Sequence, residues 1–426
     1  MKKKVLAVSA ACALTAATAV PALALENEFH GMFRVFGYAS NFAEGGSGAI
    51  APSNDASTKS YVEQRARLMY IAKASDDLKL VTHFEIDSRW GDSSYGAAAR
   101  NQGGAIGADK VNLETKNVYL DFNIPSTAIN AKVGMQPWVD SYGGIFVNAD
   151  MAGALVSAKY AGFNNSLGWF RFNEEAGSLP GKATRDFLVI DSKYNMTKDI
   201  KVGGSYYLLT TDYKGDDNTM SHMLGLNGEF KLDPVTLGLF GMYQFGETPF
   251  SKSSDLSAYA VGATAKAKLG IGTARAAFLY TSGDKRTGDN EDSSAFQAIA
   301  PESNFYGAEM MIMLRNKYNI NTDRALVHSL NNADQGFVGG FLGYDATITP
   351  KVYGSVNAGF GAAANTTHDS NYLGTELNGE VGYKLFDNMT ASIQGAYLFL
   401  GDYYDEGATE NADDPYIARV MLNYAF

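Results

Sequence analysis

The stretch PYIARVMLNYAF, residues 415–426, decides the fold. Every second residue in it is apolar or aromatic: Tyr416, Ala418, Val420, Leu422, Tyr424 and Phe426. Successive side chains of a β-strand point to opposite faces, so these residues share one continuous apolar face. Aromatic residues stand at both ends of that face, with aliphatic residues between them. This order is typical of a strand in a transmembrane β-barrel, where aliphatic side chains face lipid and aromatic side chains lie at the membrane interfaces.

The same stretch resembles the C-terminal insertion signal of Gram-negative outer-membrane proteins, a final amphipathic strand that ends in Phe. The residues that carry the resemblance are Tyr416, Val420, Leu422, Tyr424 and Phe426. The resemblance implies assembly by the barrel-assembly machinery, with outer-membrane lipid and lipopolysaccharide as surroundings.

The other end of the chain has the pattern of a secretory signal peptide. Three lysines at residues 2–4 precede an apolar run over residues 5–14, and the segment ends on Ala22-Leu23-Ala24. A basic start, a short apolar core and an Ala-x-Ala end are the marks of such a peptide. We predict cleavage after Ala24, which makes residues 1–24 the signal peptide and residues 25–426 a single domain exported through the periplasm. A lipoprotein signal at Cys12 is less favoured, because Ser9 stands where Leu is usual.

Composition excludes several classes of protein. Loss of the signal peptide removes three lysines and takes the formal charge from −11 to −14, which argues against a nucleic-acid partner. Cys12 is the only cysteine, so the exported chain has no disulfide and no thiolate metal site. After the signal peptide, no stretch of apolar residues is long enough for a membrane-spanning helix. The five histidines have no metal-ligand spacing, and we predict no cofactor.

The mature chain reads as one series of amphipathic strands separated by turns and loops. We place them at residues 29–41, 61–74, 79–90, 112–124, 130–137, 153–161, 166–173, 185–195, 200–211, 221–232, 235–246, 257–269, 272–282, 336–348, 351–361, 372–384, 389–400 and 415–426. The prediction is an all-β, transmembrane, antiparallel up-and-down β-barrel of about 18 strands, within a range of 16–20, with short periplasmic turns and longer extracellular loops. An even count puts both termini on the periplasmic side.

One stretch, residues 283–335, is too long for an ordinary connection. It opens with a charged, solvent-exposed run over residues 284–292 and contains an apolar run over residues 305–314. We favour an ordered extracellular or lumenal loop, which could include a short helix. The alternative is an extra hairpin, which would make 20 strands.

Two further segments, NVYLDF at residues 117–122 and KVGMQPW at residues 132–138, are similar to a pair of neighbouring strands in Gram-negative porins. The resemblance implies that the segment Val139 to Gly153 is the loop that such porins fold into the lumen. The strand count suits substrate-selective and alginate-export-like porins of 18 strands better than the general trimeric porins of 16. The sequence does not decide the oligomeric state, and a homotrimer is one of the alternatives.

The face opposite the lipid should point into a polar lumen. Among basic residues, alternation places inward Arg34, Arg65, Arg67, Arg89, Lys132, Lys159, Arg171 and Arg275. Among acidic residues, it places inward Glu63, Glu85, Asp87 and Asp121. In general porins a basic wall faces an acidic third loop, so the resemblance implies a constriction of Arg34, Arg65, Arg67 and Arg89 opposite Asp140 and Asp150. The alternative is that these charges pair with strand neighbours and only solvate the lumen.

The leading functional hypothesis is a porin for passive diffusion of small hydrophilic solutes or ions. A second hypothesis is a barrel that acts as a sheath around cytochromes and so lets electrons cross the membrane. A third hypothesis is a surface receptor or adhesin, but the sequence shows no large loop domain of the kind that such a protein would need. We expect no enzyme, because Ser221 and His222 are adjacent in a strand and therefore point to opposite faces.

Overall fold

The structure is a computed structural model. It describes residues 25–43, 46–93, 103–107, 111–174, 183–212, 218–249, 255–284, 292–299, 309–320, 322–406 and 411–426. The predicted signal peptide, most of the charged run at residues 284–292 and the first part of the apolar run at residues 305–314 lie outside the described residues.

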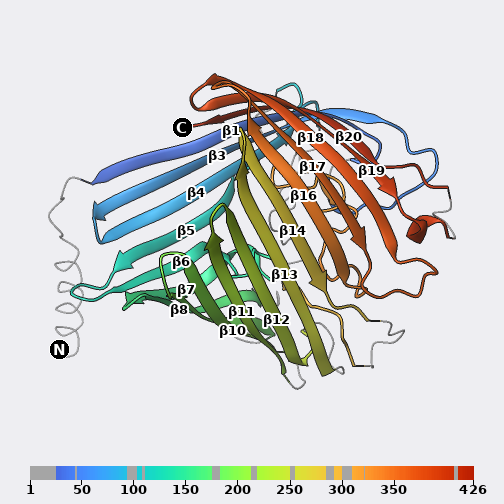
Figure 1. Ribbon diagram of the computed structural model, residues 1–426. Helices are drawn as coiled ribbons and strands as arrows, with labels where there is room; N and C mark the ends of the chain where they lie inside the picture. Colours follow the sequence, from blue (N-terminus) through green and yellow to red (C-terminus); the bar gives the residue numbers. More distant parts are fainter. Residues whose placement is uncertain are drawn as a thin grey trace, which may run out of the picture.

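Eighteen strands form one closed antiparallel sheet (Figure 1). They are β1 (Glu26–Ser40), β3 (Lys59–Ser75), β4 (Leu78–Arg89), β5 (Glu114–Asn123), β6 (Ile129–Val139), β7 (Asn148–Tyr160), β8 (Phe163–Glu174), β9 (Thr184–Asn195), β10 (Ile200–Thr211), β11 (Thr219–Leu232), β12 (Val235–Glu247), β13 (Asp255–Leu269), β14 (Gly272–Thr281), β16 (Phe337–Thr347), β17 (Val352–Ala362), β18 (Tyr372–Phe386), β19 (Met389–Leu400) and β20 (Tyr416–Ala425). Each strand pairs with the next one in the wall, and β1 also pairs with β20, which closes the barrel.

The predicted up-and-down barrel of 18 strands is confirmed. Every predicted wall strand is present, and β7 is the strand whose start differs most, since it begins at Asn148 rather than at 153. The described parts of the long connection add no strand to the wall, so the 20-stranded alternative is not what these residues form. Their one strand is β15 (Asp323–Ala325), which pairs in parallel with β2 (Ser47–Ala49). Among the described residues, no helix has the length and apolar character needed to cross a bilayer.

Side chains alternate between the outer wall and the barrel interior. In β20, Arg419 and Met421 are buried inside the barrel, whereas Val420 between them is 60% exposed on the outer wall. In β4, Asp87 is buried while its neighbour Ile86 faces outward. The terminal stretch therefore has the lipid-facing side that its period of two predicts.

Exposed aromatic residues gather at both ends of the outer wall. Near the short turns lie Phe29, Tyr160, Phe163, Tyr383, Phe386, Tyr424 and Phe426. Nearer the long loops lie Trp90, Tyr243, Tyr259, Tyr372, Tyr397 and Phe399. The band between them is mainly aliphatic and includes Leu120, Val156, Leu167, Ile190, Leu224, Leu239, Leu342, Val356, Ile393 and Val420. Two aromatic girdles around an aliphatic band are the outer surface of a barrel that spans a bilayer.

A neighbouring pair of residues in β8 tests this orientation. Leu167 is 54% exposed on the outer wall, whereas the hydroxyl of Ser166 lies 3.0 Å from that of Ser157 on the lumenal face. We expect Leu167→Arg to lower barrel stability by about 2–4 kcal/mol if it lies near the bilayer midplane. Ser166→Arg should cost much less, because it places the guanidinium in the lumen opposite Asp191, its Cα partner in β9. Urea titration of the folded barrel in lipid vesicles measures both, and equal losses would contradict the orientation.

Candidate functional site

The barrel lumen contains two parts of the chain that fold inward. The first is the β6–β7 loop, residues 140–147, in which Tyr142, Ile145 and Phe146 are buried. The second is the β14–β16 connection, whose described residues 309–320 and 322–330 we call the inner segment. Most of its apolar side chains are buried too, and the segment bonds inward-facing side chains of β18 and β3, which places it inside the barrel. Both parts therefore narrow the lumen.

Asp140 holds the β6–β7 loop in its folded form. Its carboxylate accepts four backbone N–H groups, from Tyr142 at 2.7 Å, Gly144 at 2.9 Å, Phe146 at 2.7 Å and Val147 at 2.8 Å. Burial raises the pKa of Asp140 above its ordinary value, and the four donors offset part of that rise. One side chain thus satisfies half of the amides of a short irregular loop.

Aromatic packing seats the same loop on the wall. The ring of Phe146 stacks on Tyr207 of β10 with centroids 5.9 Å apart, and Tyr142 lies 5.8 Å from Phe240 of β12. Phe146 also meets the β14–β16 connection, because its carbonyl accepts the N–H of Ile299 at 3.1 Å. The two inward-folded parts therefore touch each other inside the barrel.

Carboxylates of the wall bind the inner segment. Glu376 of β18 accepts the N–H groups of Met311, Ile312 and Met313 at 2.7, 3.0 and 2.7 Å. On the opposite side of the segment, Glu63 of β3 accepts the hydroxyl of Thr322 at 2.9 Å.

Two arginines bind the inner segment from their own strands. Arg65 donates to the carbonyl of Ile320 at 3.1 Å, and Arg419 of β20 donates to the side chain of Asn316 at 3.1 Å. Charged side chains of β3, β18 and β20 therefore hold the inner segment in place.

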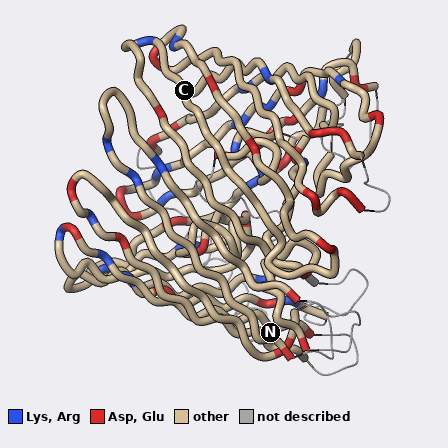
Figure 2. Tube along the Cα trace, turned by 45° about the vertical axis from the view of Figure 1, so that its right-hand side comes forward, with Lys and Arg blue, Asp and Glu red and all other residues tan. Residues whose placement is uncertain are grey.

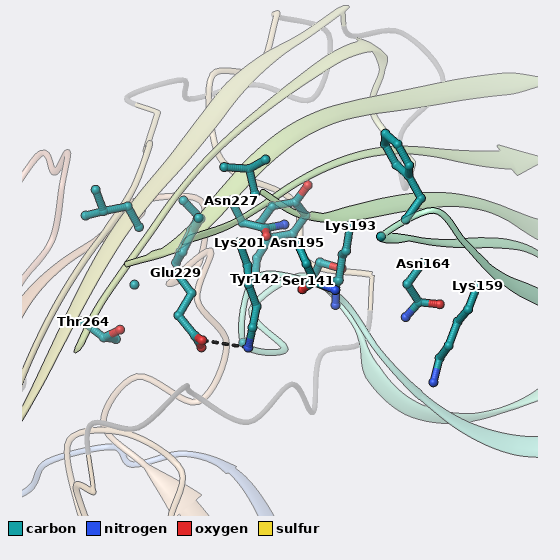
Figure 3. A pocket seen from close by; sticks show the side chains of 18 of the residues that line it. Ser141, Tyr142, Lys159, Asn164, Lys193, Asn195, Lys201, Asn227, Glu229 and Thr264 are labelled. Carbon is teal, nitrogen blue, oxygen red and sulfur yellow. Dashed lines mark hydrogen bonds and ion pairs between the residues drawn. The ribbon is translucent and has the colours of Figure 1, made fainter. Parts of the chain in front are cut away.

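A cavity of about 790 Å³ lies beneath the β6–β7 loop, toward the short-turn end of the lumen. Three lysines from different strands line it: Lys159 of β7, Lys193 of β9 and Lys201 of β10 (Figure 3). Lys201 pairs with Glu229 at 2.9 Å, whereas no carboxylate of the described residues lies within ion-pair distance of Lys159 or Lys193. The cavity therefore has an excess of positive charge.

No protein-family model matches the chain, and no curated protein matches it by sequence. Solved structures do match in fold. The outer membrane protein OpdK from Pseudomonas aeruginosa has a TM-score of 0.59 and 13% identity over 94% of this chain and 98% of its own. OccAB4 from Acinetobacter baumannii has a TM-score of 0.57 and 14% identity over 95% of this chain and 99% of its own. The chain has the fold of an outer-membrane porin.

Within this porin fold, the predicted basic wall is neutralised by its neighbours. Arg65 forms a bidentate ion pair with Asp87, in which both hydrogen bonds are 2.7 Å long, and it lies 3.2 Å from Glu85. Arg67 pairs with Glu85, and Arg89 pairs with Asp92. Basic and acidic residues lie close together along the wall strands (Figure 2).

Most of the other predicted lumen residues are also paired: Arg171 with Asp186 and Arg275 with Asp345, whereas Lys159 has no ion pair among the described residues. Arg34 bonds the side chain of Asn423 at 3.0 Å and lies 5.0 Å over the ring of Tyr318. Asp121 lies 3.5 Å from Lys79 and 4.0 Å from Lys132.

Asp140 and Asp150 are not placed as the resemblance implied. The carboxylate of Asp140 is turned into its own loop, and Asp150 belongs to β7, where it bonds Lys116 at 2.8 Å and Asn117 at 2.8 Å. Neither residue bonds the arginines Arg34, Arg65, Arg67 or Arg89. The physical reason is that buried backbone amides and a nearby lysine bind these carboxylates locally. In this structure both carboxylates pair with groups next to them.

Four residues of the site were not predicted from the sequence: Glu376, Arg419, Lys193 and Lys201. Lys193 and Lys201 could have been found, because the alternation that puts Asp191 and Ser205 inward puts these lysines on the same face. No local pattern marks Glu376, since the backbone amides that it binds lie more than sixty positions away in the chain.

Proposed function

We propose that this protein is a porin for passive diffusion of small hydrophilic solutes or ions across the outer membrane, with a preference for anions. The observation that carries the preference is the cavity beneath the β6–β7 loop, where Lys159 and Lys193 face water without a carboxylate partner among the described residues. Ammonium groups in a confined passage raise the local concentration of anions. A transport role needs no catalytic group.

The proposal includes export and assembly. Residues 1–24 would be removed as the signal peptide, and residues 25–426 would be inserted by the barrel-assembly machinery among outer-membrane lipid and lipopolysaccharide. A homotrimer is one form that the inserted barrel could take, and native gels of the purified barrel would establish the number of chains.

A cytochrome sheath is not supported by the interior of this barrel. A sheath needs a wide lumen, whereas here the β6–β7 loop and the β14–β16 connection meet inside it through Phe146 and Ile299. Their contact places this chain's own residues where an enclosed haem protein would have to lie.

The double change Lys159→Glu and Lys193→Glu tests the anion preference. In planar bilayers with a salt gradient, we expect the reversal potential of the variant to move toward the equilibrium potential of the cation. The anion-to-cation permeability ratio should fall by at least roughly fivefold, since one unit charge about 4 Å from an ion is already worth about 1 kcal/mol in water, and the two reversals change the lumenal charge by four units. The shift should be largest at low salt, where screening is weak.

Lys198→Glu is the matched control, because Lys198 lies on the exposed turn between β9 and β10, outside the cavity. It should leave the reversal potential nearly unchanged. A wild-type channel without anion preference, or a double variant that keeps it, would refute the role of the two lysines.

A further inference from the structure

Glu376 is a buried carboxylate whose partners are backbone amides and one side-chain amide. It has no exposed surface, and Asn378, two residues along on the same face of β18, donates to it at 2.8 Å. Among the described residues, no lysine or arginine lies within ion-pair distance of it. Its charge is balanced instead by the three consecutive N–H groups of Met311, Ile312 and Met313, an arrangement that favours an anion.

The inner segment depends on this carboxylate because it lacks regular structure of its own. Residues 309–313 form no helix or strand, so these amides have no ladder partner. A buried N–H without an acceptor costs about 1–3 kcal/mol. Glu376 supplies two acceptor oxygens for three donors, and Asn378 adds a bond to the carbonyl of Glu309 at 3.0 Å. One strand of the wall therefore positions this end of the segment.

The wall is also shaped to receive the segment. A side chain on Gly359 of β17 would come within 2.8 Å of the sulfur of Met310, and one on Gly361 within 2.8 Å of the sulfur of Met313. Because both positions are glycine, the two methionines can lie directly against the backbone of β17. Glu376 of β18 and the glycine positions of β17 therefore both hold residues 310–313 against the wall.

The segment borders open space on its other side. A second lumenal cavity, of about 580 Å³, is lined by Glu309, Lys317 and Tyr318 of the segment together with wall residues of β13 to β18. Lys317 and Glu309 form an ion pair of 2.6 Å at its edge. Displacement of residues 309–313 from the wall would therefore change the dimensions of the lumen and not only the stability of a loop.

We propose that Glu376 is the positioning residue that holds the inner segment in the lumen and thereby sets the width of the passage, an inference that rests on the proposed channel function. Loss of its carboxylate leaves at least one of the three amides without an acceptor and frees residues 309–313 from β18. The passage then widens and fluctuates, while the wall strands keep their pairing.

Single-channel recording of Glu376→Gln tests the proposal. Gln keeps the size of the side chain but offers one acceptor oxygen, and its NH2 group opposes an N–H donor. We expect a higher mean conductance with rapid fluctuation between levels, and partial return toward the wild-type value in Glu376→Asp. Glu247→Gln is the control, because Glu247 also accepts a backbone N–H, that of Met220 at 2.9 Å, but lies on the outer face of β12 with Tyr243 and lines neither lumenal cavity. It should conduct as the wild type does.

A second variant approaches the same contact from the other side. Ile312→Pro removes one of the three N–H donors without touching the wall, and it should raise conductance in the same direction, whereas Ile312→Val should not. This variant also decides the matter if Glu376→Gln fails to assemble, as judged by heat-modifiable migration in gels. A wild-type barrel that does not conduct would refute the proposed function. A conducting wild type with unchanged conductance in assembled Glu376→Gln or Ile312→Pro would overturn the role of Glu376 alone.

Discussion

Deletion of Phe426 is expected to prevent most of the protein from reaching the folded barrel. The backbone of Phe426 makes the last two hydrogen bonds of the seam that closes the wall, from its N–H to the carbonyl of Gly31 at 3.0 Å and from the N–H of Gly31 to its own carbonyl at 2.8 Å. Phe426 is 52% exposed, and its ring stacks on Tyr424 on the lipid side with centroids 5.6 Å apart.

The deletion removes backbone pairing and interfacial aromatic surface at one place. Two hydrogen bonds are worth about 0.5–1.5 kcal/mol each, and burial of a Phe side chain about 1.5–3 kcal/mol. Gly31 shows how closely the ring is packed, since a Cβ added there would lie 2.5 Å from the Cζ atom of Phe426. Phe426→Asp should be at least as harmful, because it also places a charge at the lipid-facing end of the seam.

The yield of heat-modifiable barrel in outer-membrane fractions measures this effect. Phe386→Asp is the matched control, because Phe386 is also an exposed aromatic residue near a short turn, but it is the last residue of β18 and pairs with Met389 of β19, away from the closing seam. We expect the yield of Phe386→Asp to stay near that of the wild type. Similar yields from the deletion and the control would mean that the terminal residue has no special part in closure or insertion.

The architecture could be predicted because its signal is local. In β20 and β4, the alternation of apolar and polar residues can be read from each strand alone, so every strand gives independent evidence for a barrel wall. The tight turn at residues 75–77, together with a register shift between Lys73 and Ser75, sets the pairing that brings Arg65 opposite Asp87. Alternation alone reports the face of a residue and not its partner, and it therefore left both alternatives open, a basic constriction and charges that pair with their neighbours.

The interior of the lumen could not be predicted in the same way. Glu376 and Met311 are brought together only by closure of the barrel and by the path of the long connection, neither of which has a periodic signature. The position of the β6–β7 loop followed from the resemblance to porins, but the direction of the Asp140 carboxylate did not. A short loop satisfies its own amides first, so its acidic residue turned inward and did not face the arginines.

Asp140→Asn is expected to release the β6–β7 loop while leaving the wall intact. The two oxygens of Asp140 accept four N–H groups, whereas Asn has one acceptor oxygen and would oppose the remaining amides with an NH2 group. Hydrogen bonds to a charged group contribute about 1.5–3 kcal/mol each, so loss of two of them destabilises the folded loop by about 3–6 kcal/mol. The seam between β1 and β20 does not involve this loop, and assembly should be nearly normal.

Limited chymotrypsin treatment of reconstituted barrels gives the clearest measurement. Tyr142 and Phe146 are buried inside the lumen, where the protease cannot reach them, and they become cleavage sites only when the loop leaves the interior. We expect rapid cutting within residues 140–147 in Asp140→Asn, together with a noisier and larger single-channel current. Asp150→Asn is the control, because Asp150 bonds Lys116 and Asn117 and no amide of the loop. If both variants resist cleavage as the wild type does, then aromatic packing of Phe146 against Tyr207 holds the loop in place and the carboxylate of Asp140 does not.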